Sequence, residues 1–168
     1  MTTARHIIIA LLLVLAQGAI DNYVNLSVYL DPSLCIYILL TLPPRWGAIP
    51  SMATGFILGL TVDVLGNGIP GMTAAAMTAT GVFRRSIFNL TAPKEKEKRQ
   101  NFEAMGLRNF LLYSLPLILI FLTVYILLDS SGFRPAGQCL ARLGISLAAN
   151  TALTAFLYTA SNDSRRKQ

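Results

Sequence analysis

Long apolar runs alternate with short polar breaks along the whole chain. The breaks contain proline, glycine or charged residues, and the longest of them covers residues 84–109. A helix needs about 20 mostly apolar residues to cross the hydrocarbon core of a bilayer. The pattern therefore predicts an all-α protein with one integral membrane domain over residues 1–168 and six transmembrane helices. These spans are expected over residues 7–26, 32–45, 48–65, 69–83, 110–128 and 136–160.

The first two runs leave alternatives open. Residues 16–19 are mostly small, as at a signal-peptide cleavage site, but further membrane segments follow them, which favours a retained first helix. The second run has little more than half the length of a crossing, and it ends at Pro43-Pro44. Proline ends a helix because it lacks the backbone donor. This span therefore needs a tilted neighbour or local thinning of the bilayer, or it crosses only in part.

The third and fourth runs are predicted to form a close helical hairpin, because the Gly/Pro cluster over residues 66–71 requires a tight turn. Gly55, Gly59 and Asp63 follow one another at i, i+4 and i+8, so they share one face of the third span. Such a face lets another helix approach closely. It serves either internal packing or a partner. The small side chains over residues 73–80 fit a helix packed on most sides, or one that lines a cavity.

Asp63 is the most informative charged residue within the apolar runs. A carboxylate near the end of a membrane span is costly unless it is paired or lies near water. Arg142 lies about two turns into the sixth span, at a similar expected depth. We therefore expect an intramembrane ion pair between Asp63 and Arg142. The alternative is that each side chain reaches the interface separately.

Composition and charge agree with a membrane protein. Hydrophobic residues make up 54% of the chain and charged residues 13%, whereas about a quarter of an ordinary soluble domain is charged. With six crossings both termini lie on one side, which then holds twelve of the fourteen Lys and Arg residues. Positive charge is retained inside the cell, so both termini are expected in the cytoplasm. The twelve are Arg5, Arg45, Arg84, Arg85, Lys94, Lys96, Lys98, Arg99, Arg108, Arg165, Arg166 and Lys167.

The connection over residues 84–109 is expected to be a basic cytoplasmic loop. It is either a plain solvated loop or a contact for the cytoskeleton or for lipid headgroups. A basic groove interleaved with aromatic residues is missing, so nucleic acid is not expected as a partner. The basic residues assigned to this loop are Arg84, Arg85, Lys94, Lys96, Lys98 and Arg99.

Catalytic chemistry finds little support in the sequence. The single histidine, His6, lies near the start of the chain, and the carboxylates are scattered over loops instead of being paired. Neither an HExxH metal motif nor a glycine-rich phosphate loop with its lysine occurs. Cys35 and Cys139 show no metal-ligand spacing and are expected to be small core residues. We therefore predict a protein that is not an enzyme and that holds no metal or cofactor.

Residues 42–85 resemble a known family. The chain reads Leu-Pro-Pro-Arg-Trp-Gly over 42–47 and Gly-Phe-Ile-Leu-Gly-Leu-Thr-Val-Asp over 55–63, followed by Gly66 and Gly71. A proline-containing turn, a G-F-x-x-G-L-x-x-D helix and a glycine-rich turn in this order are similar to MreD, the rod-shape-determining membrane protein family of bacteria. The motif positions carried over are Gly55, Gly59, Asp63, Gly66 and Gly71.

The resemblance implies a fold, a function and partners. MreD proteins have a fold similar to the substrate-binding subunits of energy-coupling-factor vitamin transporters. They are non-catalytic scaffolds of the elongation complex that inserts peptidoglycan and maintains rod shape. The resemblance implies direct binding of MreC and, through it, association with MreB, the RodA glycosyltransferase and a penicillin-binding transpeptidase.

A small-molecule uptake subunit of the vitamin-transporter type is the alternative function, because it shares the architecture. The two functions differ at the site, since an uptake subunit needs a cavity near the outer face with several convergent polar groups. The sequence nominates few such groups, namely Asp63, Arg142, Asn67 and Asn150.

Overall fold

A computed structural model describes residues 3–23, 31–66, 69–91, 106–130 and 136–166. These residues contain six α-helices. Strands are absent from these segments, so the predicted all-α class is confirmed. The helices are α1 (Thr3–Tyr23), α2 (Cys35–Leu40), α3 (Ala48–Leu65), α4 (Met72–Thr91), α5 (Leu107–Asp129) and α6 (Ala136–Arg166).

Three of these helices are long and apolar enough to cross a membrane. By length and composition they are Ala48–Leu65, Leu107–Asp129 and Ala136–Ser161. The bounds of α3 are those predicted from the sequence. In contrast, α4 continues through the two arginines at 84 and 85 and ends at Thr91, beyond the predicted end at residue 83.

The second apolar run does not form the single helix that was predicted over residues 32–45. Its helix, α2, has six residues, which corresponds to a length of about 9 Å. Proline at position 32 and the pair at 43–44 confine the helix to the residues between them, because the residue before a proline is also biased away from helix. Non-helical chain precedes α2 at 31–34 and follows it at 41–47.

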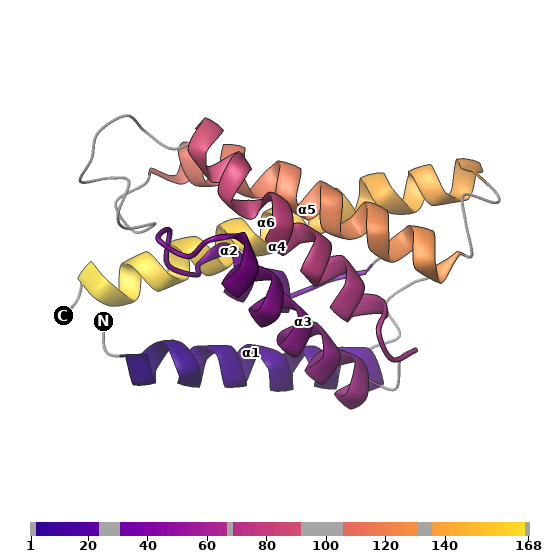
Figure 1. Cartoon of the computed structure of the whole chain (residues 1–168), viewed down its shortest axis with the longest axis horizontal. Helices are drawn as coiled ribbons and strands as arrows, with labels where there is room; N and C mark the ends of the chain where they lie inside the picture. The colour runs from indigo at the N-terminus through magenta and orange to yellow at the C-terminus, as the bar shows by residue number, and fades with distance from the viewer. Residues whose placement is uncertain (1–2, 24–30, 67–68, 92–105, 131–135, 167–168) are drawn as a thin grey trace.

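The helices run back and forth between two ends of the bundle (Figure 1). The first turn of α1 and the last turn of α6 lie at one end, which we call the terminal end. The starts of α3 and α5 and the last turn of α4 lie there as well. The opposite end, the distal end, holds the last turns of α1, α3 and α5 and the first turns of α4 and α6. Residues 31–47 thus run from the distal to the terminal end, although only the six residues of α2 are helical.

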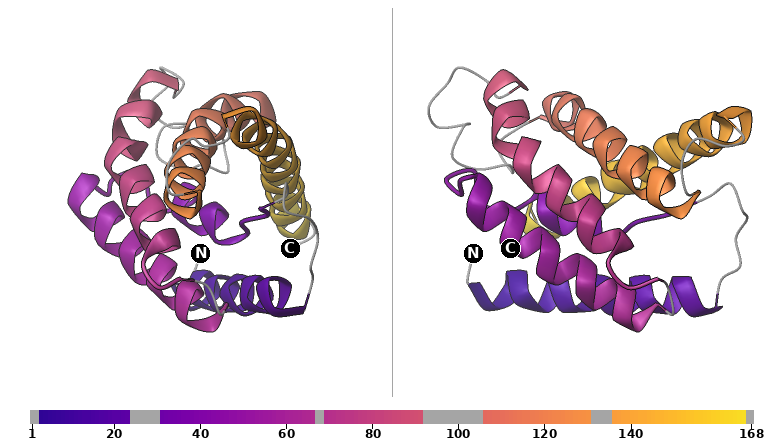
Figure 2. Two further views of the ribbon diagram at one scale, coloured as in Figure 1. Left: turned by 90° about the vertical axis from the view of Figure 1, so that its right-hand side faces the viewer. Right: turned by 45° about the vertical axis from the view of Figure 1, so that its right-hand side comes forward.

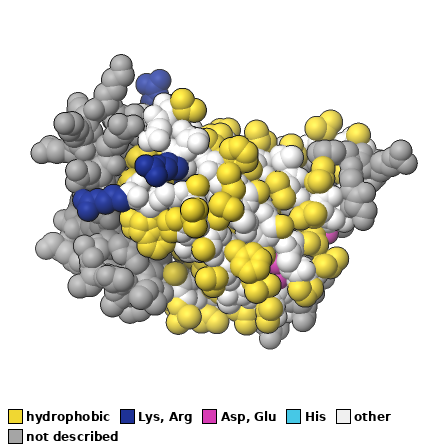
Figure 3. Space-filling view, in the orientation of Figure 1, with side chains coloured by type: hydrophobic (Ala, Val, Ile, Leu, Met, Phe, Trp, Pro, Cys, Tyr) yellow, Lys and Arg dark blue, Asp and Glu magenta, His cyan; other side chains and the backbone are white. Residues whose placement is uncertain are grey.

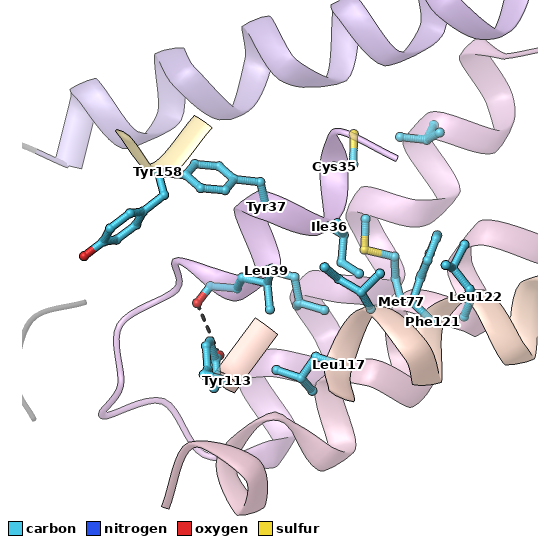
Figure 4. Close-up of a cluster of buried hydrophobic side chains, with 14 of the residues drawn as sticks. Cys35, Ile36, Tyr37, Leu39, Met77, Tyr113, Leu117, Phe121, Leu122 and Tyr158 are labelled. Carbon is cyan, nitrogen blue, oxygen red and sulfur yellow. Dashed lines mark hydrogen bonds between the residues drawn. The ribbon is translucent and has the colours of Figure 1, made fainter. Parts of the chain in front are cut away.

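The short helix α2 forms the centre of the hydrophobic core. Figure 2 shows it inside a ring made by the five longer helices. Cys35, Ile36, Leu39 and Leu40 are fully buried. Figure 4 shows Ile36 and Leu39 among side chains of α4 and α5, whereas the sulfur of Cys35 faces α1 and lies 3.9 Å from the carbonyl oxygen of Leu13. The hydroxyl of Tyr113 donates a hydrogen bond to the carbonyl oxygen of Leu40 at 3.3 Å. A six-residue helix is marginal alone, so burial in this core is what maintains it.

The hairpin of α3 and α4 is the closest helix pair of the bundle. A Cβ atom added at Gly59 would lie 2.5 Å from the Cα atom of Ala74, and one at Gly55 would lie 2.7 Å from the carbonyl oxygen of Met77. On the other helix, a Cβ at Gly81 would lie 2.8 Å from the carbonyl oxygen of Ser51. Glycine is required at these positions because the two backbones touch, as in small-residue packing between membrane helices.

The face of the bundle drawn in Figure 3 carries many apolar side chains around its middle, and the arginines visible on it lie at the terminal end. Large hydrophobic side chains such as Ile57, Leu112 and Phe156 are exposed on the faces of α3, α5 and α6 that point away from the core. A soluble monomer rarely exposes contiguous apolar area on this scale, so the surface is that of a protein covered by lipid or by other chains.

We expect Gly59→Val to destabilise the protein by about 1–3 kcal/mol, because the added side chain overlaps the α4 backbone and the hairpin must open. Gly144→Ala is the matched control, since no atom lies within 4 Å of a Cβ at that position. Thermal unfolding of the two purified variants in detergent, followed by circular dichroism, measures the difference. Equal melting temperatures for Gly59→Val and the wild type would contradict the close contact.

Candidate functional site

A network of polar side chains at the distal end is the most developed candidate site. It surrounds residues 31–34, which precede α2 and of which only the Leu34 carbonyl accepts a hydrogen bond from that helix, from the Tyr37 amide at 3.1 Å. Its side chains come from α1, α5, α6 and the 31–34 segment itself. We call it the distal network, and its members are Gln17, Asp21, Asp31, Asp129, Arg142, Ser146 and Asn150.

Asn150 of α6 and Gln17 of α1 fix the 31–34 segment from its two sides. The Asn150 Oδ1 atom accepts from the Ser33 amide at 2.7 Å, and its Nδ2 atom donates to the Asp31 carbonyl at 2.7 Å. The Gln17 Oε1 atom accepts from the Leu34 amide at 2.7 Å, and its Nε2 atom donates to the Pro32 carbonyl at 3.0 Å. Non-helical backbone at membrane depth persists only where its polar groups are satisfied within the protein, and these two amides meet that requirement.

Arg142 forms the charged part of the distal network. Its Nε and Nη2 atoms donate to the two carboxylate oxygens of Asp31 at 2.6 and 2.8 Å, and its Nη1 atom donates to Asp129. The bidentate contact is the strong geometry of an arginine–carboxylate pair. Ser146, one turn further along α6, accepts from the Asp31 amide at 3.1 Å. Both the side chain and the backbone of Asp31 are therefore bound to α6.

Asp63 lies apart from this network and caps the first turn of α4. It is 5% exposed, and its two oxygens accept from the backbone amides of Gly71, Thr73 and Ala74 at 2.9 to 3.1 Å. The first amides of a helix lack partners within the helix, and a negative charge there is also favoured by the helix dipole. Gly71 has a φ of +101°, a conformation that favours glycine and brings its amide toward the carboxylate.

The predicted ion pair between Asp63 and Arg142 is wrong. Arg142 binds Asp31 and Asp129, while Asp63 binds backbone amides. Asp63 needs no cation because three amide donors and the dipole of α4 stabilise its charge. The expected similar depth of the two residues did not predict their contact, because each binds groups that lie nearer to it. These are the carboxylates of Asp31 and Asp129 for Arg142 and the backbone amides at the start of α4 for Asp63.

The motif face of α3 serves internal packing, which was one of the two alternatives left open by the sequence. Gly55, Gly59 and Asp63 are all buried against α4. Gly66 ends α3, and a Cβ there would lie 2.9 Å from a carboxylate oxygen of Asp21 in α1. The face is therefore closed to a partner helix.

Arg84 was assigned to the basic loop, and this assignment is wrong. It lies within α4, is 2% exposed, and donates to the carbonyl oxygens of Leu42 and Pro43 and, at 3.2 Å, to the hydroxyl of Ser51. The guanidinium thus binds the turn that follows α2. Arg85, its neighbour, is exposed. Lys94, Lys96, Lys98, Arg99 and the nominated Asn67 lie outside the described residues.

Sequence reasoning nominated Asn150 and Arg142 as polar groups, but it missed Gln17, Ser146 and the role of Asp31. A signal for them was present. Gln17 and Asp21 are four residues apart, as are Ser146 and Asn150, so each pair lies on one face of its helix. Polar side chains repeated on one face of an otherwise apolar span indicate an inward-facing polar surface.

The distal network is suited to holding backbone in place. Its amide and guanidinium groups bind carboxylates and backbone groups of the same network. Within the described segments no group of three His, Cys, Asp or Glu side chains could hold a metal ion. Cys35 and Cys139 are buried free thiols, consistent with core residues. No family model, no curated protein and no solved structure matches the chain.

We expect Asn150→Leu to lower the free energy of unfolding by about 2–6 kcal/mol, because it leaves the Ser33 amide and the Asp31 carbonyl without their partner at about 1–3 kcal/mol each. Thr151→Val is the control: its hydroxyl bonds only the Leu147 carbonyl one turn earlier in α6, so we expect less than about 1.5 kcal/mol. Denaturant titration in mixed micelles measures both. A smaller loss for Asn150→Leu than for the control would refute this role.

We expect the melting temperature to fall in the order wild type, Asp63→Asn, Asp63→Leu. Asparagine keeps one acceptor oxygen but loses the charge that the helix dipole favours, and leucine loses every acceptor. The double variant Asp63→Arg with Arg142→Asp should be no more stable than the weaker single variant, since the two side chains do not pair. Recovery of the wild-type melting temperature by this exchange would overturn the capping role.

Proposed function

We propose that the chain is a non-catalytic, multi-pass membrane scaffold of the MreD type. In this proposal it crosses the bacterial inner membrane six times, with both termini in the cytoplasm, and its fold is similar to the substrate-binding subunits of energy-coupling-factor transporters. It binds MreC directly and, with MreB, RodA and a penicillin-binding transpeptidase, belongs to the complex that elongates rod-shaped cells.

The α3–α4 hairpin supports the assignment of the motif. Gly55 and Gly59 allow the two backbones to touch, Asp63 caps α4, and Gly71 adopts the positive φ that directs its amide to Asp63. The residues that carry the resemblance thus act together as one structural unit. A motif built from coupled packing and capping residues is more specific than glycines scattered by chance through a membrane helix.

The arrangement of the helices supports six crossings. The first turn of α1 and the last turn of α6 lie at the same end, as an even number of crossings requires (Figure 1). The turn at 41–47 lies there too, so the short second segment reaches across the bundle although α2 is short. Exposed arginines 45, 85 and 108 lie at this end, which favours the cytoplasmic side for the termini.

The choice between the two functions depends on what the polar groups of the distal network bind. They bind one another and the backbone of residues 31–34. Both ends of the Asn150 and Gln17 amides bind backbone groups of residues 31–34, and Arg142 binds two carboxylates. An uptake subunit needs convergent polar groups directed at a ligand. Here the groups at the same end are directed at the chain, which favours a scaffold.

Depletion of the gene in its host, with microscopy, tests the proposal. We expect rod-shaped cells to become round, because lateral wall insertion loses a scaffold, and a plasmid copy of the wild-type gene should restore the rods. Gly144→Ala should restore them as well, whereas Gly59→Val should restore fewer of them, because its hairpin is destabilised. Cells that keep their shape but acquire a requirement for an external vitamin would refute the scaffold and favour uptake.

Purification of the tagged protein in mild detergent then tests the partner. We expect mass spectrometry to identify an MreC-type protein in amounts comparable to the bait. The Asp63→Leu variant, in which the cap of α4 is lost, serves as a control for contacts that need the folded bundle. Recovery of a transporter ATPase pair in place of MreC would contradict the proposal.

A further inference from the structure

The charges of the described side chains are separated between the two ends of the bundle. Exposed arginines 45, 85 and 108 lie at the terminal end. The carboxylates lie at the distal end, where Arg142 binds two of them. The described carboxylates are Asp21, Asp31, Asp63 and Asp129. Among the described side chains, the terminal end therefore carries exposed arginines and no carboxylate.

Three separate elements bring the arginines to this end. A Cβ atom added at Gly47 would lie 3.4 Å from the Nη1 atom of Arg85, so the guanidinium of Arg85 in α4 lies over the 41–47 turn. Arg45 belongs to that turn. Arg108 lies in the first turn of α5, and the ring of Tyr113 in the next turns packs edge-on against Phe88 of α4 at 5.6 Å. The three arginines thus come from the 41–47 turn, from α4 and from the start of α5, which meet at the terminal end.

Apolar side chains border the arginines on the outer surface. Trp46, next to Arg45 in the sequence, is 39% exposed, and Phe83 of α4 and Leu107 of α5 are exposed near the same end of the bundle. Tryptophan is enriched where headgroups meet acyl chains, and arginine beside exposed apolar residues is typical of the same level. A ligand that matches this end carries negative charge at the level of the guanidinium groups and hydrocarbon directly below it.

We propose that Arg45, Arg85 and Arg108 bind the phosphate of anionic phospholipids at the terminal end. Guanidinium groups bind phosphate oxygens in a bidentate manner, and basic clusters between membrane helices recognise anionic headgroups. An acidic soluble partner would neutralise the arginines, but it would leave the apolar side chains of Trp46 and Phe83 exposed to water. The inference rests on the bilayer embedding of the proposed function and is independent of the scaffold role and of MreC.

Native mass spectrometry of the full-length protein in detergent, titrated with phosphatidylglycerol or with phosphatidylcholine, tests the proposal. We expect several-fold more phosphatidylglycerol than phosphatidylcholine to remain bound. Arg85→Gln with Arg108→Gln should weaken phosphatidylglycerol binding about 30-fold, which corresponds to about 1 kcal/mol for each arginine near the membrane surface. Binding of phosphatidylcholine should be unchanged.

The matched control is Lys94→Gln with Lys96→Gln, which removes the same amount of charge from the sequence segment after α4. We expect this variant to weaken phosphatidylglycerol binding less than the arginine variant does. Equal weakening by both double variants would overturn the proposal, because it would mean that net charge alone attracts the lipid. Equal binding of the two lipids by the wild type would overturn it as well. Elution volume and circular dichroism of each variant show that it is folded, and neither outcome depends on cell shape.

Discussion

The backbone from residue 31 to the amide of Leu34 enters the bundle before the hydrogen bonds of α2 begin, and the rest of the arrangement depends on how its polar groups are satisfied. In an apolar surrounding each unpaired amide or carbonyl costs about 1–3 kcal/mol. Gln17, Ser146 and Asn150 supply the partners from α1 and α6. Because these helices lie on opposite sides of the segment, the same hydrogen bonds that satisfy the backbone also join the first helix of the chain to the last. The buried position of α2 follows, since its start is fixed at Leu34.

The turn after α2 is fixed by the same principle at the other end. Arg84 reaches from α4 to the carbonyl oxygens of Leu42 and Pro43, and its aliphatic part is buried in the bundle. A short core helix is thus fixed at both of its ends by side chains from distant parts of the chain. The α3–α4 hairpin provides the rigid wall for this arrangement, because backbone contact at Gly59 and capping by Asp63 determine the position of α4 and hence of Arg84.

Much of the fold could be predicted from the sequence, but the partners of its charges could not. The bounds of α3 followed from an uninterrupted apolar run between Gly47 and Gly66, where glycines at both ends leave little ambiguity. Arg84 was misassigned because a charge at the end of an apolar run normally indicates solvent, and nothing local shows that carbonyl oxygens from residues 42 and 43 will surround it. The partner of Asp63 was missed for a related reason. A carboxylate can be stabilised by backbone amides, which every residue type provides, so the sequence does not distinguish them from a cation.

The long separation along the chain between residues 31–34 and α6 has a consequence for biosynthesis. Ser33 and Asn150 are separated by 117 positions. At a synthesis rate of roughly 5–20 residues per second, Asn150 leaves the ribosome about 6–23 s after Ser33. During that interval the segment has Gln17 on one side only. The entry of the second segment into the bundle is therefore completed after translation of the last helix, and a nascent chain that stops before α6 exposes an unsatisfied stretch of backbone to the quality-control machinery of the membrane.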